Sequence, residues 1–204
     1  QKTAYEISLG LVGSEMCIRD RDMGVASSRN PVNLAIATWS WGNYYGDAKM
    51  KGAKLDVAKW QRPDPKTAPF EAKAAGLYMI ATMSKHTAEA NGCSDAMMMD
   101  YRGYVAEATG ANIFFVKDGE VHTPTPDAFL NGLTRQTVIE MLTKMGVKVH
   151  ERHILPGELE DFNQCWLTGS AAEITPVGQI GNYNFEVGEL TQAVSKNYEQ
   201  LVRE

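Results

Sequence analysis

Short strand-like segments separated by turn residues run through most of the chain, and this pattern constrains its fold more than any other feature. Apolar and β-branched residues indicate strands at 32–39, 54–61, 96–99, 105–108, 112–116, 120–123, 148–154, 164–168 and 174–177. Asp118-Gly119 separates two of them and is a strong hairpin signal. Because these strands come in runs with few helices between them, the sequence predicts an α+β fold and not a repeated strand–helix–strand unit.

Three helices are expected among the strands. The first begins between Phe70 and Gly76 and ends at Asn91-Gly92, and the second covers 135–145 and ends at Gly146. The third covers 190–202 and is amphipathic. Its apolar face is expected to carry Leu190, Val194, Tyr198, Leu201 and Val202.

Composition excludes several classes of function. The chain has 204 residues and a net charge of −5, which disfavours a nucleic-acid binder. We find no apolar run long enough to span a bilayer, so no membrane partner is expected. The three cysteines give no disulfide frame and suit a reducing, cytoplasmic location. The four histidines form no cluster in the sequence, so no metal site is expected.

Residues 1–21 read unlike the rest of the chain. They show neither a signal-peptide pattern nor a clear helix or strand period. They resemble a translated sequencing-adapter artefact, which would make Cys17 meaningless and place the first native residue near Asp22. The alternative is a genuine but unusual N-terminal arm.

Lys73 is the most informative single residue. It lies among small and apolar neighbours, with Ala72 and Ala74 beside it. Burial there would disfavour the ammonium form, and a neutral lysine amine is a nucleophile that forms Schiff bases with carbonyl groups. For a single lysine, however, the commoner arrangement is an apolar stem lying on the surface with its charged end in water.

Glu107 is a single acid between apolar residues on the strand expected at 105–108. A buried carboxylate needs a partner, and the protonated ring nitrogen of pyridoxal phosphate would be one. The alternative is an ordinary strand residue that faces solvent.

Two turns could bind anions. Gly132 permits an unusual turn, and Thr134 is a suitable N-cap for the second helix, whose first amide groups would attract a phosphate. The segment 168–173 (TGSAAE) follows a strand, and its small residues would leave backbone amides open to a ligand beside the Ser170 hydroxyl. A capped helix and a tight turn without ligands explain these patterns equally well.

Four segments, taken in order, give the chain a family resemblance. Lys73 with Tyr78 is followed by GYVAEATGANIFFVKDG, then TPTPDAFLNGLTR, then LTGSAAEITPV. This series resembles the branched-chain amino acid aminotransferases, which belong to the class IV (fold-type IV) pyridoxal-phosphate enzymes. The resemblance extends from about Asp22 to the C-terminus.

The resemblance implies a role for each matching residue. Lys73 would hold pyridoxal 5′-phosphate as a Schiff base and carry a proton to and from the substrate, Tyr78 would bind the phenolic oxygen, and Glu107 would bind the ring nitrogen. Leu133, Thr134 and Ser170 would bind the phosphate. Leu130 and Gly132 would shape the pocket for the cofactor ring. Gly110, Ser170 and Ala171 would contact the substrate. Ser170 stands where the family usually has threonine.

The resemblance also implies a domain organisation. Residues 22–44 would be the end of a small domain, 45–69 an interdomain segment and the start of the large domain, and 70–204 the cofactor-binding large domain. The proline-rich stretch 62–69 is the best candidate for the linker between the domains. The small-domain residues that bind phosphate and substrate in the family would lie upstream of Asp22 and be missing here. The parent enzyme would be a homodimer or larger.

The expected activity is amino-group transfer between leucine, isoleucine or valine and 2-oxoglutarate. Two alternatives stay open. One is a D-amino acid aminotransferase or an aminodeoxychorismate lyase of the same fold, and the other is a fragment that binds cofactor without catalysis.

Overall fold

The structure, a computed structural model, describes residue 36 and residues 51–203. The stretch 1–21, the expected small-domain remnant 22–44 and the strand expected at 32–39 therefore lie outside the described residues, apart from Ile36, which is exposed. The predictions made for them stay predictions.

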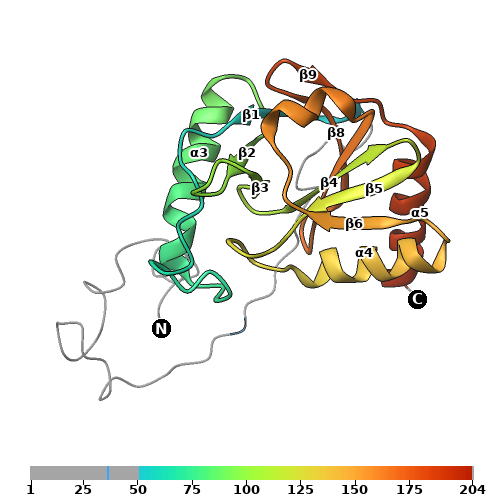
Figure 1. The fold of residues 1–204 in the computed structure, drawn as a ribbon, viewed down its shortest axis with the longest axis horizontal. Helices are drawn as coiled ribbons and strands as arrows, with labels where there is room; N and C mark the ends of the chain where they lie inside the picture. Colours follow the sequence, from blue (N-terminus) through green and yellow to red (C-terminus); the bar gives the residue numbers. More distant parts are fainter. Residues whose placement is uncertain (1–35, 37–50, 204) are drawn as a thin grey trace.

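The described residues form one mixed nine-stranded sheet (Figure 1). The order is β3-β2-β1-β8-β7-β4-β5-β6, with β9 paired to β8. β1 runs parallel to β2 and β8, β5 runs parallel to β6, and the other pairs are antiparallel. The strands are β1 (Ala53–Val57), β2 (Asp95–Met99), β3 (Val105–Ala108), β4 (Asn112–Lys117), β5 (Glu120–Pro124), β6 (Val149–Arg152), β7 (Gln164–Gly169), β8 (Glu173–Ile180) and β9 (Tyr183–Asn184).

Helices cover the sheet at two places (Figure 1). α3 packs on β2 and β1, whereas α4 and α5 contact each other and pack on β7 and β8. The helices are α3 (Met79–Ala90), α4 (Leu133–Lys144) and α5 (Glu189–Arg203), with two 3₁₀ helices, η2 (Ala75–Tyr78) and η3 (Pro156–Asp161). None of the helices within the described residues is long and apolar enough to cross a bilayer.

Alternating side chains bury both faces of the central strands. On β4, Ile113 and Phe115 join one hydrophobic cluster, whereas Phe114 joins the cluster under α4 and α5. On β7, Leu167 joins the first cluster and Trp166 joins the cluster under α4 and α5. Because successive side chains of a strand point to opposite faces, one strand contributes to two cores. This double-sided core fixes the sheet that carries the site.

The strand predictions for the middle of the chain are confirmed. β3 has the expected bounds, and the strands at 96–99, 112–116, 120–123 and 164–168 are present within one residue at each end. β1 is shorter than the expected 54–61, since Lys59, Trp60 and Gln61 are exposed. The chain returns to the sheet at Arg62, whose amide donates to the Met99 carbonyl at 2.8 Å.

The third helix is confirmed, but its expected apolar face is partly wrong. Val194 and Tyr198 are buried under the sheet as expected. Leu201 and Val202 are 52% and 49% exposed. Neither residue belongs to the hydrophobic cluster that Val194 and Tyr198 join, so the last turn of α5 leaves about half of each side chain in solvent.

Alanine at position 119 is expected to destabilise the β4–β5 hairpin. Asp118 and Gly119 have φ angles of 53° and 78°, as the hairpin signal predicts. A side chain in this left-handed region costs about 1 kcal/mol. Urea unfolding measures the loss, and Gly157→Ala is the matched control, because it also meets open space but has no positive φ. Equal stability of the two variants would contradict the prediction.

Candidate active site

A cavity of about 370 Å³ lies where the segment before α3, the start of α4 and the turns beside β3 and β7 meet. Its lining includes nine residues predicted from the sequence: Lys73, Tyr78, Glu107, Gly110, Leu130, Gly132, Leu133, Thr134 and Ser170. Ala171, the tenth, lines a neighbouring cavity of about 340 Å³ that shares Lys73, Tyr78 and Gly110 with the first. The fold thus brings together residues that are up to 98 positions apart, from Lys73 to Ala171.

Lys73 lies in an irregular segment just before η2 and lines both cavities. Of the two arrangements considered for Lys73, the exposed one is found in the described structure. The small residues around it are exposed as well, since this segment is not packed into the sheet. Its amine therefore stands at an accessible cavity wall, where a ligand can reach it.

Tyr78 closes the short η2 helix and lines both cavities. Partial burial raises the pKa of its hydroxyl, and the nearby Glu107 adds to this rise while Arg62 opposes it. The phenol is therefore protonated at neutral pH and can donate a hydrogen bond to a ligand oxygen.

Glu107 is a buried carboxyl group, and its ion pair with Arg62 offsets the cost of burying its charge only weakly. Its residue is 8% exposed, and Arg62 Nε lies 3.3 Å from its Oε1. The alignment of this ion pair is poor, because Arg62 Nε makes no hydrogen bond within the described residues. Burial raises the pKa of Glu107 to about 8, and the Arg62 charge opposes this only in part. The group is therefore ready to ionise when a cation approaches.

Arg62 is a site residue that sequence reasoning missed. It lines the cavity and its Nη1 donates to the Leu77 carbonyl at 3.3 Å. Nothing in the sequence connects it with Glu107, 45 positions away. An isolated β-bridge pairs Arg62 with Asp100, which follows β2. Because β2 pairs with β3, this pairing brings Arg62 close to Glu107 on β3.

Asn112 organises the floor of the cavity and was also missed. Its Nδ2 donates to the Leu130 carbonyl at 3.0 Å and lies 3.3 Å from Glu107 Oε2. Its Oδ1 accepts from the Gly132 amide at 3.2 Å. A Cβ atom at position 132 would lie 2.5 Å from that oxygen, so the close approach requires glycine. A polar residue at the start of a buried strand was the available signal.

The start of α4 opens on the cavity without a side-chain cap. The prediction that Thr134 is the N-cap is wrong: Gly132 occupies that position, and α4 begins at Leu133. Gly132 supplies no capping oxygen, so the first amide groups of α4 remain available and the helix dipole favours an anion there. The start of α4 therefore remains the predicted anion site, because its N-cap Gly132 leaves the first amide groups uncapped and not because Thr134 caps the helix.

The β7–β8 turn provides polar groups on the opposite side of the cavity. Ser170 is exposed there and lines the cavity. Thr168 Oγ1 is buried, lines the same cavity and has no hydrogen-bond partner among the described atoms. A buried hydroxyl without a partner costs free energy, which a polar ligand in this cavity would recover.

Glu107 is expected to make the ligand-free chain less stable as pH rises. Between the usual pKa of 4.5 and about 8, the folded state keeps a proton that the unfolded chain releases. As pH rises through this range, the contribution of Glu107 to the free energy of unfolding falls by up to about 1.4 kcal/mol per pH unit. Urea unfolding of Glu107→Gln and the parent at about pH 5 and pH 8 measures the difference.

The surface variant Glu140→Gln is the control for this comparison, because Glu140 is exposed on α4. The advantage of Glu107→Gln over the parent should grow from the lower to the higher pH. An advantage that stays constant would contradict a raised pKa at this position.

Comparison with known proteins shows the family of this chain. The model of amino-transferase class IV matches residues 16–180. A probable branched-chain-amino-acid aminotransferase of Rickettsia felis is 40% identical over 158 residues, which are 76% of this chain and 54% of the relative. The chain thus spans about half the length of this relative.

Two solved structures share the fold. A branched-chain amino acid aminotransferase of Escherichia coli matches with a TM-score of 0.82 and 31% identity, over 89% of this chain and 62% of that one. An aminotransferase of Brucella abortus bound to the cofactor PLP matches with a TM-score of 0.71 and 32% identity, over 76% and 55%. The predicted resemblance and fold are confirmed, and the interpretation of residues 1–21 stays a prediction. This chain belongs to the class IV aminotransferase family.

Proposed function

We propose that the protein containing this chain is a pyridoxal-phosphate-dependent branched-chain aminotransferase, which moves an amino group between leucine, isoleucine or valine and 2-oxoglutarate. The observation that carries the proposal is the meeting, in one cavity, of an accessible lysine amine, a buried carboxyl group and two turns whose polar groups could bind an anion. The names of the relatives in Rickettsia felis and Escherichia coli support the choice of substrate class.

The residues present fit pyridoxal phosphate. The uncapped start of α4 and the unpaired Thr168 hydroxyl both offer groups to a phosphate at this cavity. Glu107 supplies the carboxyl group that a pyridinium nitrogen needs, and its raised pKa would fall beside that cation. The Brucella abortus relative is described as bound to this cofactor.

When bound, the cofactor would act as the electron sink that makes the substrate α-proton acidic. Lys73 Nζ would attach to the cofactor aldehyde and later accept and return that proton. Tyr78 would donate a hydrogen bond to the phenolic oxygen, and Glu107 would keep the ring nitrogen protonated.

The other predicted residues would position cofactor and substrate. The Leu133 and Thr134 amides and the Ser170 hydroxyl would bind the phosphate, while Leu130 and Gly132 shape the ring pocket. The remaining substrate contacts are proposed for Gly110 and for the amides of Ser170 and Ala171.

The proposal is tested by steady-state assay of the whole protein loaded with pyridoxal phosphate. Turnover of L-leucine with 2-oxoglutarate is expected. Turnover of D-alanine alone would instead favour a D-amino acid aminotransferase, and release of pyruvate from aminodeoxychorismate would favour a lyase of the same fold. Cofactor binding without any turnover would favour a non-catalytic binding protein.

Assembly and location complete the proposal. We propose a homodimer or larger, to be measured by light scattering during gel filtration. A cytoplasmic location is supported by Cys93 and Cys165, which are both free thiols.

A further inference from the structure

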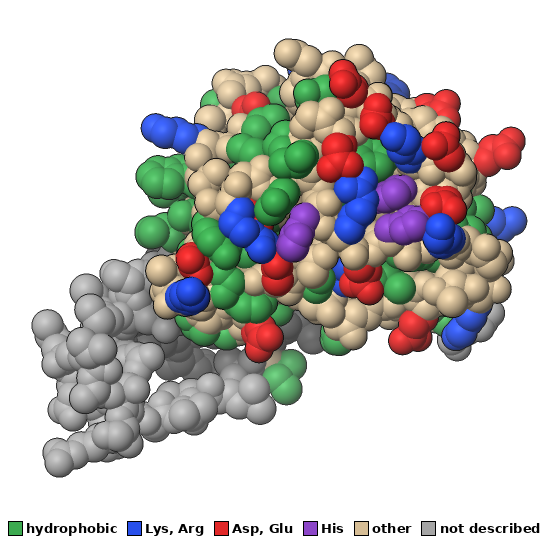
Figure 2. Space-filling model, viewed as in Figure 1, with side chains coloured by type: hydrophobic (Ala, Val, Ile, Leu, Met, Phe, Trp, Pro, Cys, Tyr) green, Lys and Arg blue, Asp and Glu red, His purple; other side chains and the backbone are tan. Residues whose placement is uncertain are grey.

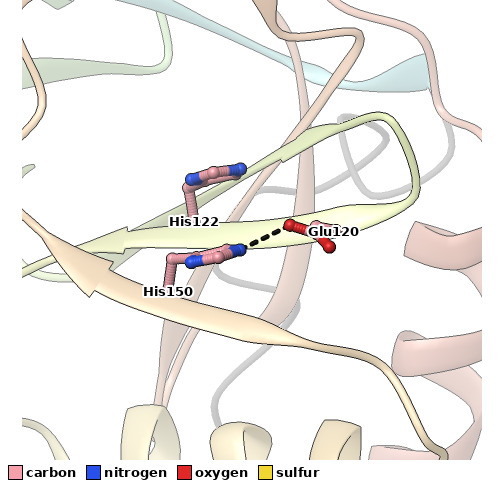
Figure 3. Close-up of side chains that lie close together, drawn as sticks. All are labelled: Glu120, His122 and His150. Carbon is pink, nitrogen blue, oxygen red and sulfur yellow. Dashed lines mark hydrogen bonds and ion pairs between the residues drawn. The ribbon is translucent and has the colours of Figure 1, made fainter.

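Two histidines and a glutamate meet on the sheet edge formed by β5 and β6, away from the cavities described above (Figure 3). His122 on β5 pairs directly with His150 on the parallel strand β6. Their rings stack with centroids 4.7 Å apart. Figure 3 shows both rings on one side of the strands, with Glu120 beyond their ends. The three side chains come from positions 120, 122 and 150, and only the strand register brings them together.

The donor atoms are close enough to share one ion. One ligand atom from each residue lies within 4.8 Å of the others. The Glu120 carboxylate lies 2.5 Å from His150 Nε2. Two ligand atoms that bind one Zn²⁺ at about 2.1 Å in a tetrahedron lie about 3.4 Å apart. Small side-chain rotations therefore convert this arrangement into a ligand set.

The protonation states suit metal binding. The His150 and Lys148 hydrogen bonds lower the pKa of Glu120, so it is a carboxylate. His150 Nε2–H must then be the donor in the hydrogen bond to Glu120. For a metal ion to bind at Nε2, that proton would move to Nδ1 through solvent, so that the ring stays a neutral imidazole. His122 Nδ1 accepts a hydrogen bond from Arg152 Nε, so this nitrogen carries a lone pair that it can offer to an ion.

Two basic side chains compete with a cation at this place. Lys148 Nζ lies 3.2 Å from Glu120, but its side chain is 65% exposed and can turn into water. Arg152 Nε donates to His122 Nδ1 at 3.1 Å, and Arg152 is also paired with Glu158 at 2.7 Å. Arg152 can therefore release His122 and keep its partner carboxylate. Figure 2 shows histidines with acidic and basic side chains around them on this open face, where an ion can enter.

We propose that Glu120, His122 and His150 bind one divalent transition-metal ion of the Zn²⁺ class, with water completing its coordination. Two histidines and one carboxylate with open positions are a common ligand set for such ions. None of the three residues lines either cavity, so the site is separate from the proposed cofactor site. The ion would join the edge strand β6 to β5.

The test is calorimetric titration of the purified chain with Zn²⁺, repeated with Co²⁺ to read coordination from its visible spectrum. The parent is expected to bind one equivalent at this cluster. Glu120→Gln, His122→Gln and His150→Gln should each weaken binding by at least about 10-fold. The control His86→Gln removes an exposed histidine on α3 and should leave the affinity unchanged.

A folding defect is separated from lost binding by thermal unfolding. At the same metal concentration the midpoint should rise in the parent and in His86→Gln, and should rise less in Glu120→Gln, whose side chain is 41% exposed and whose replacement disturbs no core packing. The proposal is overturned if the parent binds no Zn²⁺, or if the three cluster variants bind it as tightly as His86→Gln does. Thiolate bands in the Co²⁺ spectrum would equally overturn it, by assigning the ion to cysteine.

Discussion

Replacing Lys73 with alanine is expected to abolish transamination, with turnover falling by at least about 10⁴-fold. The variant would lose both the amine proposed to hold the cofactor and the group proposed to move the substrate proton. Because Lys73 is exposed in an irregular segment, its removal leaves no cavity in a core, and the fold should be unchanged. Steady-state turnover of L-leucine measures the effect, and borohydride reduction followed by mass spectrometry shows whether cofactor is covalently attached at position 73.

Two further variants distinguish loss of the reactive Lys73 amine from loss of a positive charge. Lys73→Arg keeps the positive charge but cannot attach to the cofactor, so it should be as inactive as Lys73→Ala. Lys66→Ala removes an exposed lysine seven positions earlier and should keep full activity. If reduced cofactor remained attached to the chain of Lys73→Ala, Lys73 would not be the attachment residue.

Glu107→Gln is expected to lower turnover by about 10²–10⁴-fold while cofactor remains bound. Glutamine has nearly the same shape, but it cannot carry the negative charge that keeps a pyridinium nitrogen protonated. The contacts with Arg62 and Asn112 show that the carboxyl group is held in place by neighbours on two sides. The measurement is turnover of L-leucine together with the amount of pyridoxal phosphate retained after gel filtration.

Glu140→Gln is again the matched control, and it should keep both turnover and cofactor. Unchanged turnover in Glu107→Gln would remove Glu107 from the catalytic site. Loss of cofactor together with turnover would show that this residue is needed for binding and not only for chemistry.

Local sequence was sufficient for the elements with strong short-range signals. The β4–β5 hairpin is readable from Asp118-Gly119, because few residues adopt the positive φ angles that its turn requires. The bounds of α4 were less readable: Thr134 is a good capping residue, yet the helix begins at Leu133 with Gly132 as its N-cap. The Gly132 amide donates to Asn112, a contact between distant positions that a local capping preference cannot indicate.

The sequence predicted which residues belong to the candidate site, but not how far each is buried or which groups it pairs with. The ten expected residues line two adjoining cavities, as their combined motifs implied. The sequence left open whether Lys73 is buried, and the structure shows it exposed, whereas Glu107 is paired with an arginine that no motif indicated. Burial and ion pairing depend on which segments pack together, and a single sequence does not give that information.

Periodicity, turn residues and side-chain type were enough to predict the α+β class, the strand-rich order of elements and the lysine, the carboxyl group and the two turns that suit one cofactor. The other site residues came from the family resemblance. Tertiary structure alone decided the Arg62–Glu107 pair, the Asn112 hydrogen bonds and the meeting of His122 with His150. Each joins residues on different elements, and the relative position of those elements is set by strand register and core packing.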